Sequence, residues 1–166
     1  MKNDDMKRKL KIFFNSLTRE RETFTLPLRS LLQYKLLITK EKEGEIIGIA
    51  GIHGGTHKNM FFVVVKSEYQ NKKIGQELTK EVIKQAIKRD YNYISLTVFQ
   101  SNTRAVQIFQ NQGFRTIYVS LMNARKIYFM ILPLNRRGII CGKLFVLERK
   151  LRSLLSGDIV RLRHGT

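Results

Sequence analysis

The sequence is poor in several residue types, and each scarcity excludes a class of protein. Its 166 residues include 1 Cys, 2 Pro and no Trp. The single cysteine, Cys141, allows no intramolecular disulfide and no multi-cysteine zinc or iron–sulfur site, and it is typical of a protein from a reducing compartment. Two prolines and 11 glycines are too few for a collagen-like or linker-dominated chain. What remains is an ordinary globular composition.

Long hydrophobic runs are also missing. The longest, residues 127–134, is far shorter than the roughly 18 residues that a membrane-spanning helix needs. Residues 1–9 mix basic and acidic groups, which is not typical of a signal peptide. We therefore expect a soluble, cytoplasmic protein with room for one domain and a short appendage.

Acidic residues are few. There are 31 Lys and Arg against 13 Asp and Glu, which gives a net charge of +18. Residues 135–166 hold 8 basic and 2 acidic groups, the densest excess in the chain. A basic protein of this kind favours polyanions such as nucleic acid, an anionic membrane surface or a phosphate-rich cofactor. A generally basic proteome would produce the same excess, so charge alone does not choose a function.

Hydrophobic spacing predicts the order of the secondary structure. The expected elements are a helix over 10–17, a short helix or irregular link over 26–33, strands over 34–42, 46–53 and 59–66, a helix over 74–89, a strand over 93–99, a helix over 103–112, and strands over 115–121 and 126–132. Ser101 or Asn102 should cap the helix over 103–112, and Gly113 should stop it. The order indicates an α/β fold with a mixed, mostly antiparallel twisted sheet and helices on both faces.

The last residues do not continue this pattern. Residues 135–138 indicate a break, and residues 142–156 predict a basic amphipathic helix. Its leucines share one side: Leu144, Leu147, Leu151, Leu154 and Leu155. We divide the chain into a domain over 1–134 and a basic C-terminal extension over 135–166. Packing on the domain, or on a second subunit in a homodimer, is favoured over binding to nucleic acid or a membrane.

The most informative segment is a buried strand, a short basic loop and a helix start, over residues 61–89. A loop that leads into a helix N-terminus offers unpaired backbone amides at the positive end of the helix dipole. Lys72 and Lys73 add two charges there, so a pyrophosphate fits the place. The spacing matches neither the P-loop nor the glycine-rich dinucleotide fingerprint.

At this segment the chain resembles the GNAT superfamily of N-acetyltransferases. The superfamily's signature, Arg/Gln-x-x-Gly-x-Gly/Ala, is matched by Gln70-Asn71-Lys72-Lys73-Ile74-Gly75 at its first and last positions. A second element, Asn-x-x-Ala-x-x-Leu/Ile-Tyr-x-x-x-Gly-Phe, is matched from Asn102 to Phe114, with Phe109 in place of Tyr. The two elements and the strands around them cover about residues 35–134. Residues 13–17 also look like the first helix of a subset of the family.

The resemblance implies acetyl-CoA as co-substrate and no metal. The pyrophosphate would lie on the amides of residues 70–75, and the pantetheine would add like a short strand beside residues 63–65, where that strand parts from the one over 93–99. Asn102 would approach the pantetheine or fix the helix start, and Phe109 would pack near the thioester. The implied cofactor-binding residues are Val63, Val64, Val65, Gln70, Asn71, Lys72, Lys73, Ile74, Gly75, Gln76, Asn102 and Phe109.

Three positions depart from the family pattern. Lys73 stands where the family has its first Gly, and it is compatible with the site if its φ is ordinary. Phe109 stands where many members place a Tyr that protonates the departing thiolate. Met60 lies near the position where some relatives carry a Glu in the strand.

The general base is therefore left open among several residues. Transfer to an amine requires a group that accepts a proton, directly or through water. The candidates are His53, His57 and Glu68, and Tyr118 is a possible substitute acid. Each also has a structural interpretation: a solvated histidine, a carboxylate partner of Lys66 or Lys72, and a core tyrosine.

We weigh three functions. The leading one is an N-acetyltransferase that moves acetyl from acetyl-CoA to an amine of a small molecule or protein by direct attack, with a backbone amide near Val64 or Val65 stabilising the oxyanion. The alternative is a degenerate GNAT-fold module that binds acyl-CoA or regulates without catalysis. The third is a nucleic-acid-associated protein that uses the basic surface, although the interleaved aromatic and basic pattern of single-strand readers is missing.

Overall fold

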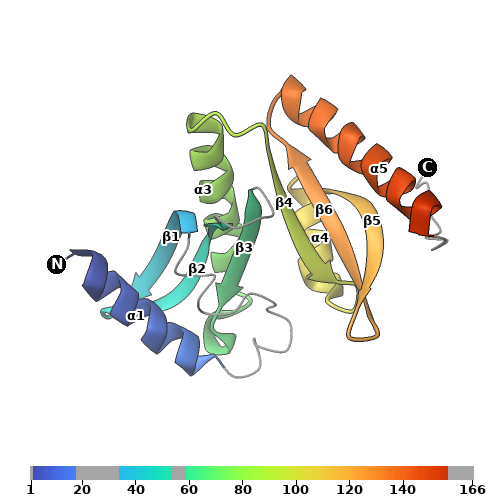
Figure 1. Ribbon diagram of the computed structural model, residues 1–166. Helices are drawn as coiled ribbons and strands as arrows, with labels where there is room; N and C mark the ends of the chain where they lie inside the picture. Colours follow the sequence, from blue (N-terminus) through green and yellow to red (C-terminus); the bar gives the residue numbers. More distant parts are fainter. Residues whose placement is uncertain (1, 18–33, 54–58, 157–166) are drawn as a thin grey trace. The chain divides into compact units, whose positions relative to one another are not determined.

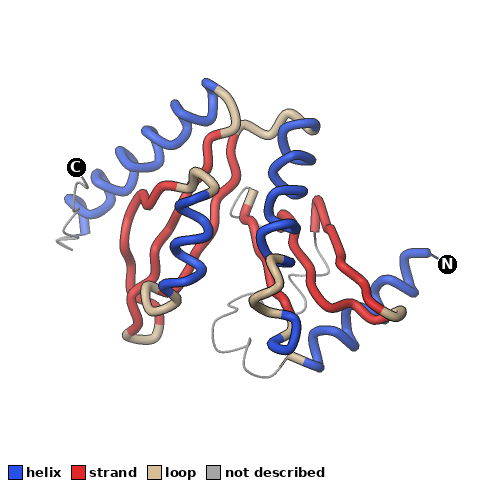
Figure 2. Tube along the Cα trace, turned by 180° about the vertical axis from the view of Figure 1, so that it is seen from behind, coloured by secondary structure: helices blue, strands red, loops and turns tan. Residues whose placement is uncertain are grey.

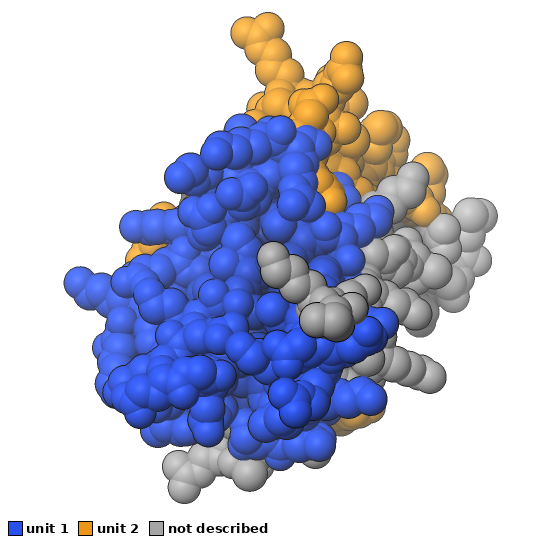
Figure 3. Space-filling model, turned by 90° about the vertical axis from the view of Figure 1, so that its left-hand side faces the viewer, with its two compact units in different colours: residues 1–89 blue, residues 90–166 orange. Residues whose placement is uncertain are grey.

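The computed structural model describes residues 2–17, 34–53 and 59–156 (Figure 1). They belong to two compact units, residues 1–89 and 90–166 (Figure 3). The link predicted over 26–33 and the candidate base His57 lie outside the described residues.

The first unit is a three-stranded antiparallel sheet with helices. Its elements are α1 (Lys2–Ser16), β1 (Tyr34–Lys42), β2 (Glu45–His53), β3 (Met60–Val65), the 3₁₀ helix η2 (Ser67–Tyr69) and α3 (Ile74–Lys88). β2 pairs with β1 on one side and with β3 on the other. The β1–β2 turn places Glu43 and Gly44 at φ of 53° and 82°. Positive φ at both central residues suits the twist of a tight hairpin.

Both faces of this sheet are covered by helices. Strand residues alternate between the faces, so Ile49, Phe62 and Val64 share one side. That side packs against Leu10, Phe13 and Leu17 from α1 and the residue that follows it. On the other side a Cβ at Gly48 would lie 3.1 Å from Leu78 of α3 and 3.3 Å from Val65. The sheet is thus a layer between α1 and α3, as predicted.

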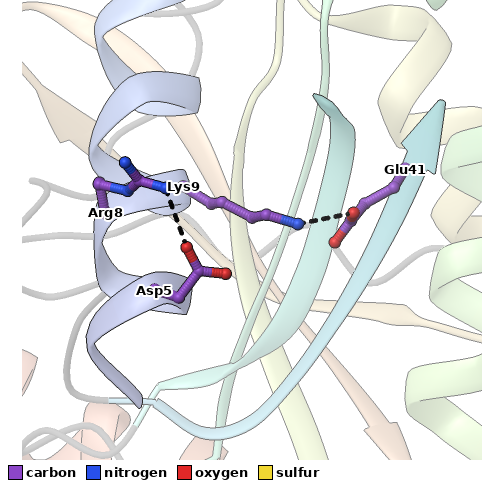
Figure 4. Close-up of polar contacts among 4 residues, drawn as sticks. All are labelled: Asp5, Arg8, Lys9 and Glu41. Atoms are coloured by element: carbon purple, nitrogen blue, oxygen red, sulfur yellow. Dashed lines mark hydrogen bonds and ion pairs between the residues drawn. The ribbon is translucent and has the colours of Figure 1, made fainter. Parts of the chain in front are cut away.

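Helix α1 begins earlier than predicted, at Lys2 rather than near residue 10. Its first turns are polar, so hydrophobic spacing could not show them. Arg8 donates to Asp5 at 3.2 Å within the helix, and Lys9 Nζ lies 3.0 Å from Glu41 Oε2 on β1 (Figure 4). Both pairs are at least partly exposed, so they orient the helix while the apolar face provides most of the stability.

The apolar face of α3 differs in part from the prediction. Ile74, Leu78 and Val82 are buried as expected, together with Ala86 and Thr79. Ile87, which the helical repeat of Ile74, Leu78, Val82, Ile83 and Ile87 in the sequence predicts on this face, is 55% exposed. Steps of four residues from Ile74 reach Ala86, and Ile87 lies about 100° further around the helix.

The second unit contains β4 (Tyr93–Phe99), α4 (Thr103–Asn111), β5 (Arg115–Met122), β6 (Arg125–Pro133) and α5 (Arg136–Ser156). β6 pairs antiparallel with β4 and with β5, so it is the middle strand of the three. Helix α4 lies behind these strands in Figure 1 and in front of them when the molecule is turned round in Figure 2.

Helix α4 has the predicted cap and stop. The Asn102 side chain accepts from the Ala105 N–H at 3.2 Å. At the other end Gly113 adopts φ 92°, its N–H donates to the Gln110 carbonyl, and the Phe114 N–H donates to the Phe109 carbonyl. These bonds define a Schellman motif, whose apolar contact is the edge-on packing of Phe109 and Phe114 with ring centroids 5.7 Å apart.

Helix α5 begins at Arg136, six residues before the predicted start, and the predicted break is instead its cap. Asn135 Oδ1 accepts from the Gly138 N–H at 3.0 Å. The Phe145 ring stacks on Phe129 of β6, so the helix packs on the strands of its own unit. No helix in the described ranges is both long and apolar enough to cross a membrane.

Candidate functional site

The loop between β3 and α3 is fixed by hydrogen bonds at its first residues. The Tyr69 N–H donates to the Lys66 carbonyl at 2.9 Å. Gln70 donates twice: its N–H to the Ser67 carbonyl at 3.1 Å and its Nε2 to the Val65 carbonyl at 3.1 Å. Gln70 therefore ties the loop to the end of β3, which holds the following backbone in place.

The backbone then passes through the left-handed region twice. Asn71 has φ 66°, and Lys73, which is the N-cap of α3, has φ 62° and ψ 0°. Lys73 therefore does not have the ordinary φ under which it was predicted to be compatible with the site. Lysine keeps the conformation that the family's glycine adopts easily, at a cost of about 1–2 kcal/mol for a side chain in this region.

The loop and the first turn of α3 present a row of amide donors. The first helical hydrogen bond runs from the Glu77 N–H to the Lys73 carbonyl at 3.0 Å. Within the described ranges, no backbone carbonyl accepts from the N–H groups of residues 71–76. These groups lie at the positive end of a 15-residue helix, and left-handed residues beside ordinary ones form anion-binding concavities.

Lysines reinforce this positive end. Lys72 and Lys73 are exposed. The Nζ of Lys72 lies 5.0 Å from the centroid of the Tyr69 ring, and the Nζ of Lys42 lies 5.8 Å from the same centroid. Sequence reasoning missed Lys42, because only the β1–β2 hairpin brings the end of β1 to this loop. Two ammonium groups thus lie over the Tyr69 ring: that of Lys72, which belongs to the loop, and that of Lys42, which also pairs with Glu43 at 3.6 Å.

Gly75 leaves the surface over the first turn of α3 open. A Cβ built on Gly75 would meet only Val65 Cγ2 within 4 Å, at 3.7 Å. Its carbonyl accepts from the buried Thr79 hydroxyl at 2.6 Å, inside the helix. Since packing does not require glycine here, the open space above Gly75 fits the close approach of a phosphate group to the amides.

The candidate base His53 lies beside Met60. His53 is the last residue of β2, is partly buried, and pairs in register with Met60 on β3 and Tyr34 on β1. Directly opposed residues of an antiparallel pair point to the same face. The structure therefore places a histidine next to the strand position where some relatives have a glutamate.

Glu68 lies at the other end of β3. It is an exposed residue of η2, which follows Val65. Met60 and Val65 are separated by five residues at about 3.3 Å each, or roughly 17 Å. His53 and Glu68 are thus not brought together, and Glu68 lies at the end of β3 that carries the amide row.

The second unit gives structural roles to the remaining candidates. Asn102 fixes the helix start, one of its two predicted roles. Phe109 is 7% exposed and packs on Phe114. Tyr118 is only partly buried and stacks on Phe129 with ring centroids 4.8 Å apart. The described residues contain no cluster of three His, Cys, Asp or Glu side chains able to hold a metal ion.

The match to a family model defines the class of protein. The model for the acetyltransferase (GNAT) domain matches residues 13–130. The chain therefore belongs to the GNAT acetyltransferase family. A search of curated protein sequences gives no significant match.

Solved structures agree on the fold. The GNAT-family acetyltransferase from Streptococcus pneumoniae has a TM-score of 0.63 and 21% identity, over 78% of this chain and 93% of that one. YncA from Salmonella typhimurium, solved with its cofactor acetyl-CoA, has a TM-score of 0.55 and 20% identity, over 65% and 69%. The ribosomal-protein-S18-alanine N-acetyltransferase from Escherichia coli has a TM-score of 0.52 and 19% identity, over 75% and 76%. The predicted mixed α/β, mostly antiparallel fold is confirmed.

Proposed function

We propose that this GNAT-family protein is an N-acetyltransferase that transfers acetyl from acetyl-CoA to an amine of a small molecule or protein by direct attack. The observation that carries the proposal is the row of backbone N–H groups over residues 71–76, at the positive end of α3 and beside Lys72 and Lys73. A diphosphate is the ligand that satisfies such donors and offsets such charge.

The coenzyme then lies along β3. Its pyrophosphate accepts from the amides of the loop and of the first turn of α3, over the open surface at Gly75. Its pantetheine arm follows the backbone of Val63, Val64 and Val65 toward the Met60 end of the strand. When bound, the coenzyme supplies an acetyl thioester, which is activated toward an amine.

His53 is the base in this arrangement, and Glu68 is not. An arm anchored at the loop ends near Met60, and His53 lies directly across from that residue. The imidazole can take the proton that the attacking amine loses, directly or through one water. Glu68 lies at the phosphate end of β3, where its carboxylate would oppose the anion.

Thiol release with a panel of amines tests the reaction. His53→Gln should lower kcat by about 100-fold or more, because a positioned base contributes that much. The loss should shrink at alkaline pH, where free amine is more abundant. The matched variant Glu68→Gln distinguishes the candidates: a large loss there with normal turnover in His53→Gln would exclude His53 as the base.

The alternative function is a GNAT-fold module that binds acyl-CoA without turnover. Phe109 and Met60 favour it, because neither has a proton to give or take where relatives have Tyr and Glu. Tight binding of acetyl-CoA with no thiol release for any amine would support this alternative and refute the enzyme.

A further inference from the structure

Helix α5 has two apolar faces. One packs on its own unit: Gly138 and Gly142 are buried, and the Phe145 ring contacts Tyr93 and Phe129. The opposite face is exposed, and it consists of Ile140 (58%), Leu144 (58%), Leu147 (53%) and Leu151 (52%). We call these four residues the α5 seam.

The spacing of the α5 seam is that of a coiled coil. Its residues follow one another at intervals of four, three and four, which is the alternation of d and a positions in a heptad. At 100° per residue these four lie within about 60° of arc, the narrow stripe of a helix pair, and Ile139, also exposed (50%), lies about 80° outside it. The stripe lies opposite the buried glycines, so the seam is presented away from the sheet.

We propose that the α5 seam binds the α5 seam of a second copy of this chain, in parallel orientation. Charge decides the orientation. In the heptad set by Leu144 at a and Leu147 at d, Lys143 occupies g and Glu148 occupies e. A parallel pair brings Lys143 of one copy to Glu148 of the partner subunit. An antiparallel pair brings lysine to lysine and glutamate to glutamate, which is repulsive.

The chemistry of the seam favours a protein helix over a lipid surface. Helices that lie in a membrane interface have a broad apolar face, commonly with Trp, Phe or Leu. The α5 seam is narrow, and the one described aromatic residue of α5, Phe145, faces the protein's own strands. The basic charge of the chain would assist anionic lipid, so membrane binding is the competing outcome of the test.

Sedimentation velocity of the full chain across concentrations tests the pairing. Wild type should show a monomer–dimer equilibrium, and Leu147→Glu should raise the dissociation constant by at least about tenfold. Because Leu147 is already exposed, this variant should keep its fold, which circular dichroism checks. The matched control is Ile12→Glu, an exposed helical position in α1 (63%), which should dimerise like wild type.

Two further sets of variants test the orientation. Lys143→Glu should weaken the dimer, and adding Glu148→Lys should restore it, since the pair is then reversed in both copies. In a Cys141→Ser background, Leu147→Cys should form a disulfide across a parallel dimer, where equivalent d positions meet. The Leu144→Cys and Leu147→Cys variants are also mixed. Disulfides that form only between one Leu144→Cys subunit and one Leu147→Cys subunit would overturn the parallel arrangement.

A monomer at all concentrations would overturn the proposal. If such a monomer also co-sedimented with phosphatidylserine vesicles, and Leu147→Glu abolished that binding, the seam would be a membrane-binding face instead.

Discussion

Replacing Lys73 with glycine should stabilise the protein, which is an unusual expectation for a helix N-cap. Lys73 has φ 62° and ψ 0°, and its side chain makes no capping hydrogen bond. A side chain in this region costs about 1–2 kcal/mol, whereas glycine adopts it freely. Glycine also gives the unfolded chain more conformational freedom, which offsets about 0.4–1 kcal/mol of that stabilisation. Lys73→Gly should therefore stabilise by about 1 kcal/mol, or roughly 2–4 °C in Tm for a chain of this size.

Two controls separate conformation from charge. Lys73→Gln removes the ammonium group from the positive end of α3 but keeps the Cβ, so it should raise Tm by less than Lys73→Gly does. Lys72→Gly alters a neighbour that is not among the positive-φ residues and that contacts the Tyr69 ring, so it should lower Tm. Thermal unfolding followed by circular dichroism compares the variants. A lower Tm for Lys73→Gly, or an equal rise for Lys73→Gln, would refute backbone strain as the cause.

Two other predictions concern the second unit. Gly138→Ala should destabilise the protein by at least about 2 kcal/mol in urea titrations, because its Cβ would overlap the Asn92 carbonyl oxygen. Gly142→Ala is the control, and it should be neutral or stabilising, since its Cβ would meet only Ile131 at 3.8 Å. Equal effects of the two substitutions would refute the close approach of α5 to Asn92. Burial, and to a smaller extent Cys141, raises the pKa of Tyr93 above 10.0. As the pH rises, the Tyr93 hydroxyl therefore loses its proton in the unfolded chain before it does so in the folded one. Above about pH 10 the free energy of unfolding should fall more steeply for wild type than for Tyr93→Phe, and parallel curves of that free energy against pH would contradict this.

The order and most boundaries of the elements could be predicted from the sequence, because local patterns determine them. The strands over 34–42 and 93–99 have the bounds that their apolar and β-branched runs predicted, and Ile74 begins α3. Asn102 and Gly113 have side-chain and backbone chemistry that marks helix ends. These signals are local, so they need no knowledge of the tertiary structure.

The sequence-based predictions were wrong where tertiary contacts, rather than local sequence, determine the structure. Gly138 suggested a break, but glycine is needed there because α5 approaches the backbone at Asn92, and Asn135 three residues before it is the cap. The amide row was predicted from the loop and helix order, whereas the positive φ of Lys73 was not, since a lysine gives no sign of it. Likewise the pairing of His53 with Met60 depends on strand register, which the two separate segments do not reveal.

Isothermal calorimetry with acetyl-CoA tests the central claim most directly, that the amides before and within the first turn of α3 bind a diphosphate. Wild type should release or absorb heat with a saturable isotherm, and Gly75→Trp, which fills the open space above these amides, should give none. Ile87→Trp places the same side chain at an exposed position of the same helix and should bind like wild type. Unchanged affinity in a folded Gly75→Trp variant would contradict the account.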